Sequence, residues 1–462
     1  MTDLLAADKG QPAHTIHLVD EGSFDDWKKD RSQRHRSLLD AARFDGKTGY
    51  AYVILPGSED DDWSVVTTVA DVDGLSPWCL ARLAEVLPEG NYRLAGDKDP
   101  GPAMLGWIVA QHRMDRYLTD KPTAGARILL TPNPGRIDAT RRAAEATILI
   151  RDMVDTPPED MGPGAIEARA EQVAKRYDAT VETTKGDALE QGYPMIHAVG
   201  RAATRHHAPR LVEFHWGDDS HPRLAIVGKG VSFDSGGLDI KSSKGMALMK
   251  KDMGGAAHAL ALAQMVMDAR LPVRLHLLLP TVENAIAGNA FRPGDVLVSR
   301  KGITVEIDNT DAEGRLILGD ALTKAGEDDP DLIVDFATLT GAARVALGPD
   351  LPVLFANDDD LAASVERGGS DVDDPVWRLP LWDGYDDMLK SSLADMVNSG
   401  GSGFAGSITA ALFLRRFVPD DTDWIHFDTF AWRPAAKPGR PKGGEALGLR
   451  ATFDMLEQRY RL

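Results

Sequence analysis

The sequence predicts an α/β protein of two domains, a smaller N-terminal α/β domain and a larger C-terminal domain. The larger domain is expected to hold a mostly parallel sheet covered by helices on both faces, because short apolar runs alternate there with segments of helical spacing. A cluster of turn-forming residues, Thr131-Pro132-Asn133-Pro134-Gly135, separates the two parts. With 462 residues, the chain is long enough for two or three domains.

The N-terminal domain is expected to span residues 1–135. Apolar runs and amphipathic spacing predict strands at 50–55, 63–69 and 127–130, and helices at 77–86 and 104–117. This part of the sequence contains neither a phosphate-binding glycine loop nor a set of ligand-type residues, so we expect it to act as a scaffold or in assembly.

A connecting helix and turn are predicted at 136–160. Residues 138–154 have helical spacing, and Thr156-Pro157-Pro158 ends the pattern. The second domain is then expected to span residues 161–462.

The second domain alternates predicted strands and helices. Strands are predicted at 224–228, 275–279, 303–307, 332–337, 353–356 and 424–428, and helices at 254–269, 316–325 and 407–417. In parallel sheets, ligands bind beyond the carboxyl ends of the strands. Because Lys229, Asp311 and Thr338 each follow a predicted strand, we expect the chemistry to converge at one edge of the sheet.

Charge and cysteine content limit the class of protein. Asp and Glu outnumber Lys and Arg by 71 to 52, for a net charge of -19, which argues against nucleic acid as a partner. Cys79 is the single cysteine, so no intrachain disulfide forms and a reducing compartment is favoured. The sequence shows neither a signal-peptide pattern nor an apolar run long enough to span a membrane, and a cytoplasmic location is expected.

The most informative segment is Asn309-Thr310-Asp311-Ala312-Glu313-Gly314-Arg315-Leu316, which places two carboxylates and a guanidinium after a predicted strand. Upstream lie Asp234 and Asp252, with Lys229 and Lys241 interleaved. Each carboxylate alone would be read as a helix cap or a turn residue. Together, in apolar and glycine-rich surroundings, they are too costly to bury without bound cations, and oxygen ligands suit a pair of divalent metals.

This pattern resembles the leucine aminopeptidase family of cytosolic two-metal exopeptidases. Residues 309–316 match the signature octapeptide of that family, and further blocks match in order at 227–237, 252–257, 337–342 and 406–411. The resemblance covers most of residues 150–430, whereas the N-terminal domain resembles the family only in layout.

The resemblance implies two metal sites. The tighter site would use Lys229, Asp234, Asp252 and Glu313, and the more exchangeable site would use Asp234, Asp311 and Glu313. The metals would be Mn²⁺ or Zn²⁺, with Mg²⁺ or Co²⁺ also compatible with such ligands. As a ligand, Lys229 must be a neutral amine; the alternative is a plain salt bridge to a carboxylate.

It also implies a mechanism in which a hydroxide bridging the metals attacks the peptide carbonyl. Lys241 would stabilise the oxyanion, and Asp252 would lie near the free α-amine of the substrate. Arg315 would hold a bicarbonate that relays a proton; the alternative is that Arg315 only neutralises the cluster.

Met249, Thr338, Leu339 and Gly341 match family positions that contact the first residue of the substrate, which suggests leucine-like or other apolar residues. Met249 could equally be a core residue. The chain departs from better-known members at 439–446, so the resemblance leaves substrate preference open there.

The resemblance further implies a homohexamer acting on short peptides with a free N-terminus. Two other readings are weighed: a catalytically silent binding or regulatory protein, since some relatives also bind DNA, and a two-metal phosphatase. The complete ligand set argues against the first, and a neutral-amine ligand with a single lysine electrophile suits an amide carbonyl better than a phosphoryl group.

Overall fold

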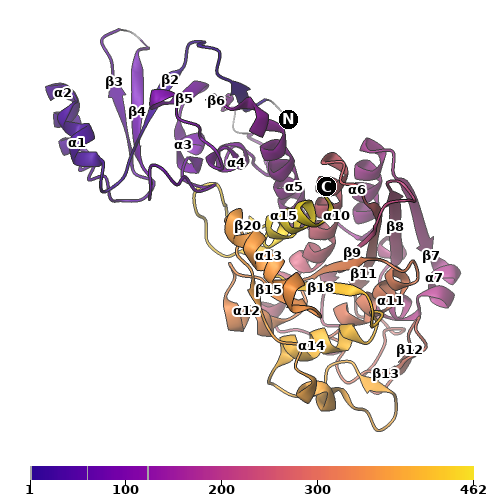
Figure 1. Cartoon of the computed structure of the whole chain (residues 1–462). Helices are drawn as coiled ribbons and strands as arrows, with labels where there is room; N and C mark the ends of the chain where they lie inside the picture. Colours follow the sequence, from indigo (N-terminus) through magenta and orange to yellow (C-terminus); the bar gives the residue numbers. More distant parts are fainter. Residues whose placement is uncertain (1–2, 60, 122–123, 462) are drawn as a thin grey trace. The chain divides into compact units, whose positions relative to one another are not determined.

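The computed structural model describes residues 3–59, 61–121 and 124–461 (Figure 1). The chain divides into two compact units. The first comprises Met1–Ile148 and Ala435–Lys442, and the second comprises Leu149–Pro434 and Gly443–Leu462. The first division falls inside one continuous helix, α5 (Ile137–Asp155).

The first unit contains a six-stranded sheet in the order β1-β6-β5-β2-β4-β3. Only the β3–β4 pair is antiparallel among these neighbours. The strands are β1 (Leu5–Ala7), β2 (His14–Val19), β3 (Tyr52–Pro56), β4 (Trp63–Thr68), β5 (Gly90–Leu94) and β6 (Arg127–Thr131). The helices are α1 (Phe24–Lys29), α2 (Gln33–Ala41), α3 (Ala81–Val86) and α4 (Ala103–Val109), with short 3₁₀ turns η1 (Ala95–Asp97) and η2 (Pro134–Arg136).

The strands predicted in this unit are confirmed, but the helix predicted at 104–117 is wrong in its second half. The helix α4 ends at Val109, and all of its residues are buried. Beyond it, the Gln111 side chain donates to the Arg127 carbonyl at 2.9 Å and accepts from the Arg127 N–H at 3.0 Å, which ties it to the start of β6. Tyr117 and Leu118 are about half exposed, so the apolar face that suggested a longer helix is not buried.

The second unit is built on a nine-stranded sheet in the order β16-β15-β18-β14-β9-β11-β8-β7, with β10 paired to β11. Its centre is parallel, and antiparallel pairs occur at β15–β18, β11–β8 and β7–β8. The strands are β7 (Thr180–Lys185), β8 (Arg210–Trp216), β9 (Arg223–Gly228), β10 (Gly230–Asp234), β11 (Arg274–Asn284), β14 (Leu332–Ala337), β15 (Val353–Ala356), β16 (Trp377–Arg378) and β18 (Asp423–Asp428). The predicted α/β class with a mostly parallel sheet is confirmed.

Helices cover both faces of this sheet (Figure 1). One face packs against α8, α11 and α14 in a large apolar core that includes Ala225, Ile333 and Trp424. The other packs against α10, which approaches the strands closely: a Cβ on Gly255 would lie 2.2 Å from the Phe336 carbonyl oxygen.

The helices of the second unit are α6 (Pro163–Arg176), α7 (Gly186–Gly192), α8 (Pro194–Gly200), α9 (Ser243–Met246), α10 (Gly254–Asp268), α11 (Gly314–Gly326), α12 (Gly341–Leu347), α13 (Asp359–Asp371), α14 (Gly406–Arg415) and α15 (Leu449–Tyr460). The 3₁₀ helices are η3 (Arg205–His207), η4 (Met249–Met253) and η5 (Asp383–Leu389). Two small sheets join β12 (Val296–Val298), β13 (Thr304–Glu306) and β17 (Met396–Val397), and β19 (Trp432–Arg433) with β20 (Gly443–Gly444). Among the described residues, the helices all fall short of the length and apolar character needed to cross a membrane.

Candidate active site

The predicted ligands gather at the carboxyl ends of the parallel strands. Lys229 directly follows β9, and Asp234 is the last residue of β10. Asp252 lies in η4, immediately before α10, and Glu313 is the N-cap residue of α11. Backbone direction alone therefore brings these side chains to one edge of the sheet.

Lys229 is buried at the centre of the cluster. Its Nζ lies 2.7 Å from Asp252 Oδ2 and 3.1 Å from Glu313 Oε1, and it donates to the Thr338 carbonyl at 3.0 Å. Gly314 makes room for this side chain, since a Cβ there would lie 2.5 Å from Lys229 Cε. A larger residue in place of Gly314 would thus collide with the Lys229 side chain.

Lys241 connects the remaining two predicted carboxylates. Its Nζ lies 2.8 Å from Asp234 Oδ2 and also pairs with Asp311 Oδ1. Asp234 is held by its other oxygen, which accepts from the Gly236 N–H and from Asn284 Nδ2, both at 2.9 Å. Lys241 therefore joins Asp311, which is about a third exposed, to the buried part of the cluster.

The donor set fits divalent cations. One oxygen each of Asp234, Asp252 and Glu313 lie within 4.8 Å of one another. Glu313 Oε2 is buried and, within the described residues, accepts no hydrogen bond, whereas the buried Asp252 Oδ2 and Asp311 Oδ1 are paired with the ammonium groups of Lys229 and Lys241. Because buried anionic oxygens without such bonds are costly, this arrangement is what hard cations would complete.

The electrostatics of the cluster lead to the same conclusion. Burial, reinforced by the Asp234 charge, raises the pKa of Glu313 to about 8 and that of Asp311 to about 6. Burial by itself would lower the pKa of Lys229, but the carboxylates of Asp252 and Glu313 outweigh it and raise that pKa. A neutral Lys229 amine therefore requires a metal cation that replaces its proton. Without such a cation, Lys229 is charged and forms the salt bridges described above, which is the alternative that the sequence also allows.

Arg315 lies in the first turn of α11 and is 7% exposed. Its Nη1 donates to the Asn398 carbonyl at 2.7 Å, and among the described residues its buried Nε finds no hydrogen-bond acceptor. Burial lowers the pKa of Arg315 to about 10, which leaves the group cationic at neutral pH. A buried cationic donor with an unused N–H is suited to hold a small anion.

Of the five predicted substrate-binding residues, Asp252 belongs to this cluster, and the other four are Met249, Thr338, Leu339 and Gly341. The Thr338 hydroxyl donates to Asp252 Oδ1 at 2.8 Å, so Thr338 helps to orient a carboxylate. The Leu339 N–H donates to Asp428 Oδ1 at 3.1 Å. Met249 begins η4, and a Cβ added at Gly341 would meet no atom within 4 Å among the described residues.

Three buried residues that sequence reasoning missed hold the site in place. Asn284 Nδ2 binds both Asp234 Oδ1 and the Thr310 carbonyl. Asn398 accepts from the Asp308 and Asn309 N–H groups and donates to the Asn309 and Ala312 carbonyls. Asp428 accepts from the N–H groups of Leu339 and Thr340 and from two hydroxyls.

Of these three residues, only Asp428 had a signal in the sequence, because it ends a predicted strand. Asn284 and Asn398 stand outside the recognised blocks, and their contacts are made across 26 to 90 positions of sequence, which periodicity does not reveal.

The divergent segment 439–446 is divided between the two units. In the first unit, the Gly439 N–H donates to Glu85 Oε1 at 2.8 Å, and the Arg440 guanidinium lies 4.5 Å from the Trp78 ring centroid. In the second unit, Glu445 is buried between two arginines, with Oε1 3.0 Å from Arg151 Nη2 and Oε2 2.9 Å from Arg433 Nε. These contacts give the segment a structural role.

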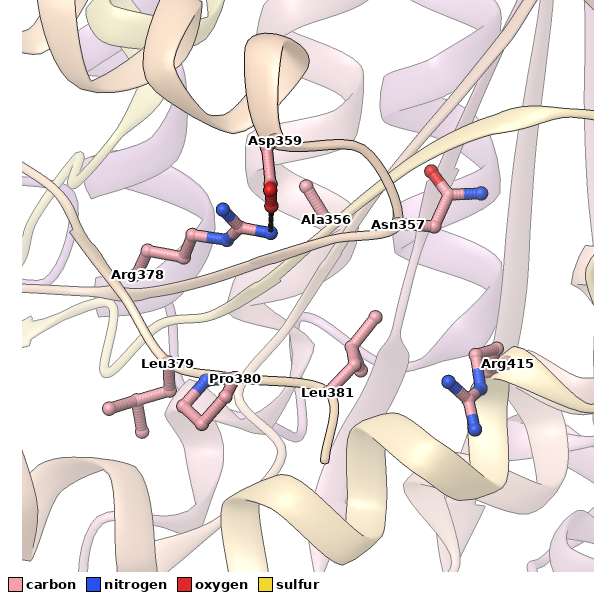
Figure 2. A pocket seen from close by; sticks show the side chains of 8 residues that line it. All are labelled: Ala356, Asn357, Asp359, Arg378, Leu379, Pro380, Leu381 and Arg415. Atoms are coloured by element: carbon pink, nitrogen blue, oxygen red, sulfur yellow. Dashed lines mark ion pairs between the residues drawn. The ribbon is translucent and has the colours of Figure 1, made fainter. Parts of the chain in front are cut away.

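A separate surface pocket of about 520 Å³ lies beyond the end of β15 (Figure 2). Arg378 and Arg415 line it, together with Leu379, Pro380 and Leu381. Arg378 pairs with Asp359 at 2.6 Å, and Arg415 pairs with Asp383 at 2.6 Å, so both charges are already matched. Its lining residues differ from those of the carboxylate cluster, and we do not assign the active site to it.

Comparison with known proteins decides the family. Residues 148–453 match the profile of the cytosol aminopeptidase family, catalytic domain, and residues 15–131 match that of the M17 aminopeptidase N-terminal domain. The chain belongs to the cytosol aminopeptidase family. Membership makes it a metal-dependent aminopeptidase, which confirms the resemblance read from the octapeptide and the other blocks.

Individual relatives agree with this assignment. The chain is 40% identical over 370 residues to a probable cytosol aminopeptidase of Syntrophotalea carbinolica, covering 76% of this chain and 74% of that protein. The crystal structure of cytosol aminopeptidase from Coxiella burnetii matches with a TM-score of 0.93 and 44% identity, covering 99% of this chain and all of that one. The bottromycin maturation enzyme BotP in complex with Mn matches with a TM-score of 0.87 and 29% identity, covering 97% and 100%.

Proposed function

We propose that this aminopeptidase removes leucine-like or other apolar residues from the free N-terminus of short peptides, with two divalent cations held by Lys229, Asp234, Asp252, Asp311 and Glu313. The observation that carries the proposal is the buried group of Asp234, Asp252 and Glu313, whose ligand oxygens lie within 4.8 Å of one another and of which Glu313 Oε2 accepts no hydrogen bond among the described residues. When bound, the cations would supply Lewis acidity toward the peptide carbonyl and a water of lowered pKa.

The residues around the cations have separate roles in this proposal. Lys241, whose pKa is raised by the neighbouring carboxylates against the effect of burial, stays cationic and donates to the carbonyl oxygen where negative charge develops. Asp252, fixed by the Thr338 hydroxyl, faces the α-amine of the substrate and thereby selects unblocked peptides. Arg315 holds a bicarbonate through its unused N–H and so places a proton acceptor beside the site.

The preference for apolar first residues is proposed from Met249, Thr338, Leu339 and Gly341. The open space next to Gly341 leaves room for a side chain, and Met249 offers a flexible apolar wall. The Leu339 carbonyl would receive the substrate amine or its peptide N–H.

The deciding experiment measures hydrolysis of leucine p-nitroanilide by the full chain after exhaustive chelation and again after Mn²⁺ or Zn²⁺ is restored. We expect activity to vanish on chelation and to return with metal. Alanine, lysine and glutamate p-nitroanilides test the first-residue preference, and p-nitrophenyl phosphate and a DNA gel shift serve as controls. Turnover of the phosphate ester alone, or undiminished turnover without metal, would refute the proposal.

We further propose that the protein is a cytoplasmic homohexamer. This assembly is implied by the family and is tested by light scattering on the eluting protein. An active species with the mass of one chain, 50.0 kDa, would contradict it.

A further inference from the structure

A second group of metal-ligating side chains lies at the opposite end of the nine-stranded sheet. His276 is the third residue of β11, and His215 stands directly opposite it on the antiparallel neighbour β8. Asp328 comes from the turn between α11 and β14. We call these three residues the edge cluster. The strands β9 and β14 run parallel to β11, and Lys229 and Thr338 of the candidate active site follow their carboxyl ends, so the edge cluster lies at their amino ends.

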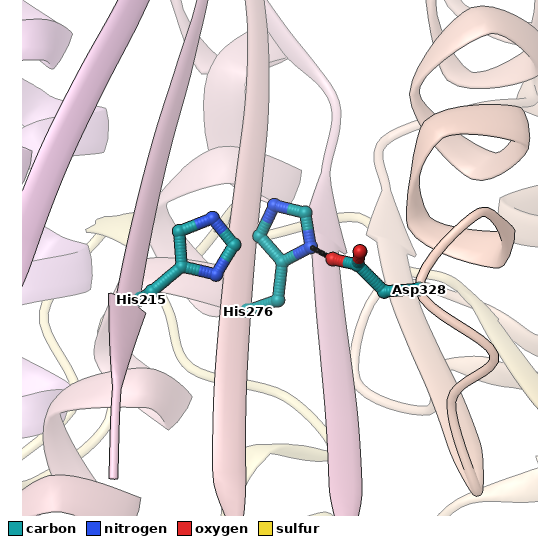
Figure 3. A group of neighbouring side chains, drawn as sticks. All are labelled: His215, His276 and Asp328. Carbon is teal, nitrogen blue, oxygen red and sulfur yellow. Dashed lines mark ion pairs between the residues drawn. The ribbon is translucent and has the colours of Figure 1, made fainter. Parts of the chain in front are cut away.

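The three side chains of the edge cluster lie close together (Figure 3). The two imidazole rings are stacked, with centroids 4.1 Å apart and an interplanar angle of 29°. His276 Nδ1 lies 3.1 Å from Asp328 Oδ2, and one ligand atom from each of the three residues lies within 4.8 Å of the others. Around a tetrahedral zinc ion, neighbouring nitrogen and oxygen ligands are separated by roughly 3.4 Å, so this spacing is close to that of a metal site.

The His276 ring lies between two carboxylates, those of Glu213 and Asp328. Its Nε2 lies 3.0 Å from Glu213 Oε1, and both residues are buried. Since a carboxylate only accepts, Nε2 carries the hydrogen. Nδ1 is also buried, and within the described chain it makes no hydrogen bond of acceptable geometry, although Asp328 Oδ2 is near. Asp328 and Glu213 raise the pKa of His276 against the effect of burial, so a positive charge is favoured between Nδ1 and Asp328. That charge is a second ring proton in the metal-free protein, or a metal cation that replaces it.

This is the arrangement commonly found around histidine ligands. A metal-bound imidazole usually donates its second ring N–H to a carboxylate, which fixes the tautomer and raises the basicity of the ligand nitrogen. Glu213 is placed to do this, because it lies on the same face of β8 as His215, two residues away.

The space at the edge cluster has the size of a single ion. A cavity of about 10 Å³ is lined by His215, His276 and Asp328, together with Arg223 and Arg274. Such a volume holds one water or one ion and excludes organic ligands. The two arginines are engaged elsewhere: Arg274 pairs with Asp219 at 3.2 Å, and Arg223 donates to the Asp328 backbone carbonyl.

We propose that His215, His276 and Asp328 bind one divalent cation of the zinc class, separately from the carboxylate cluster. Two imidazole nitrogens and one carboxylate oxygen are the ligands that zinc prefers, and the remaining coordination position is open to water. Binding requires the half-buried His215 ring to turn out of its stack so that a nitrogen faces the cavity. The ion joins two adjacent strands to the α11–β14 turn and so acts as a structural clip.

The test compares the tag-free wild-type chain with the double variant His215→Gln/Asp328→Asn. Both are stripped, equilibrated with zinc and analysed for metal per chain. We expect the wild type to retain one zinc per chain more than the double variant, because only the edge cluster is altered. Crystals of the zinc-loaded wild type should show an anomalous peak between His276 Nδ1 and Asp328.

The control is Asp329→Asn, which removes the same charge from the exposed neighbouring residue. It should match the wild type in zinc content, and Asn also tolerates the positive φ of 51° at this position. Far-ultraviolet circular dichroism verifies that the double variant is folded, and Asp328→Asn alone provides a milder second variant. The proposal would be overturned if the wild type, the double variant and Asp328→Asn contained equal zinc, or if no anomalous peak appeared. The edge cluster would then be an ion-pair network only.

Discussion

Glu445 shows how a single buried charge is tolerated in this protein. Its two carboxylate oxygens are each matched by a different guanidinium, from Arg151 and Arg433, and all three side chains are about 3% exposed. Burial alone would raise the pKa of Glu445, but the two arginines lower it below its ordinary value of 4.5. Glu445, in the divergent segment 439–446, therefore stays ionised and has a structural role.

We expect Glu445→Gln to lower the free energy of unfolding by about 3 kcal/mol at pH 7, because it leaves the buried Arg151 guanidinium without its carboxylate partner, although Arg433 keeps Asp350. The folded-state pKa lies below the unfolded one, so the ion pairs stabilise the fold above about pH 4.5, and this contribution is lost as the pH falls through the folded-state pKa. Urea titrations from pH 3 to 8 should therefore show the difference between the two proteins shrinking toward acid.

The matched control is Glu327→Gln. Glu327 also pairs with an arginine, Arg300, at 2.6 Å, but the carboxylate is 41% exposed. Its loss should cost less than about 1 kcal/mol. If both substitutions cost the same, burial is not what makes Glu445 important.

The open space at Gly341 gives a prediction about specificity. A valine there would project its methyl groups into the volume proposed for the first side chain of the substrate, since a Cβ at this position meets no atom within 4 Å among the described residues. Gly341→Val should reduce kcat/KM for leucine p-nitroanilide by roughly 10- to 100-fold and should affect alanine p-nitroanilide less. Gly288→Val, at another position where a Cβ is unobstructed, should leave both rates unchanged. A parallel loss for both substrates would place Gly341 outside the pocket.

At the scale of elements, the conformation of the octapeptide 309–316 is stabilised by a residue from a distant segment. It spans the link from β13 to α11, and Asn398, from the segment after β17, binds four backbone groups around it. The Asn398 carbonyl also accepts from Arg315. Ligand geometry at Asp311 and Glu313 thus depends on a residue about 90 positions away.

Asn398→Asp tests this dependence, because it keeps the shape but replaces the two N–H donors with an acceptor. We expect metal affinity to fall roughly 10- to 100-fold, since supporting residues of metal sites have effects of that size, while saturating Mn²⁺ restores most of kcat. Metal titration of activity measures both quantities. Asn289→Asp, an exposed asparagine that also donates to a backbone carbonyl, is the control. Unchanged metal affinity in Asn398→Asp would remove Asn398 from the support of the site.

Strands and helices with strong periodicity were predictable. The strands β14 and β15 have the predicted bounds, and α10 and α11 differ by a few residues at their ends. The helix predicted at 104–117 was wrong beyond Val109. Gln111, which the prediction placed inside the helix, follows its end, and its side chain binds the backbone of β6. Local spacing does not carry such long-range contacts.

For the site, the charged residues and glycines were visible in the sequence because their chemistry is unusual. Asn284 and Asn398 were not, since an amide that binds backbone groups is ordinary in composition and is recognised only when its partners are in place. Gly314 leaves room for the Lys229 side chain, a contact that only the structure shows.

For the whole molecule, the proposed metal ligands all belong to the second unit, Leu149–Pro434 with Gly443–Leu462. Metal should therefore stabilise that unit by mass action, by about 2.7 kcal/mol at a concentration 100 times the Kd. We expect calorimetry to resolve two transitions, of which chelation lowers only one. In Glu313→Gln, neither transition should respond to Mn²⁺. A single transition that shifts as a whole would mean that the two units unfold together.

The first unit is assembled from two distant stretches, with Ala435–Lys442 added to Met1–Ile148. On the ribosome, the long stretch emerges early, whereas its eight-residue complement leaves only after Leu149–Pro434 has been translated. At elongation speeds of about 5–20 residues per second, that interval lasts roughly 15–60 s. During this interval, Glu85 and Trp78 lack their contacts with Ala435–Lys442. The nascent chain is therefore a natural client for chaperones at that stage.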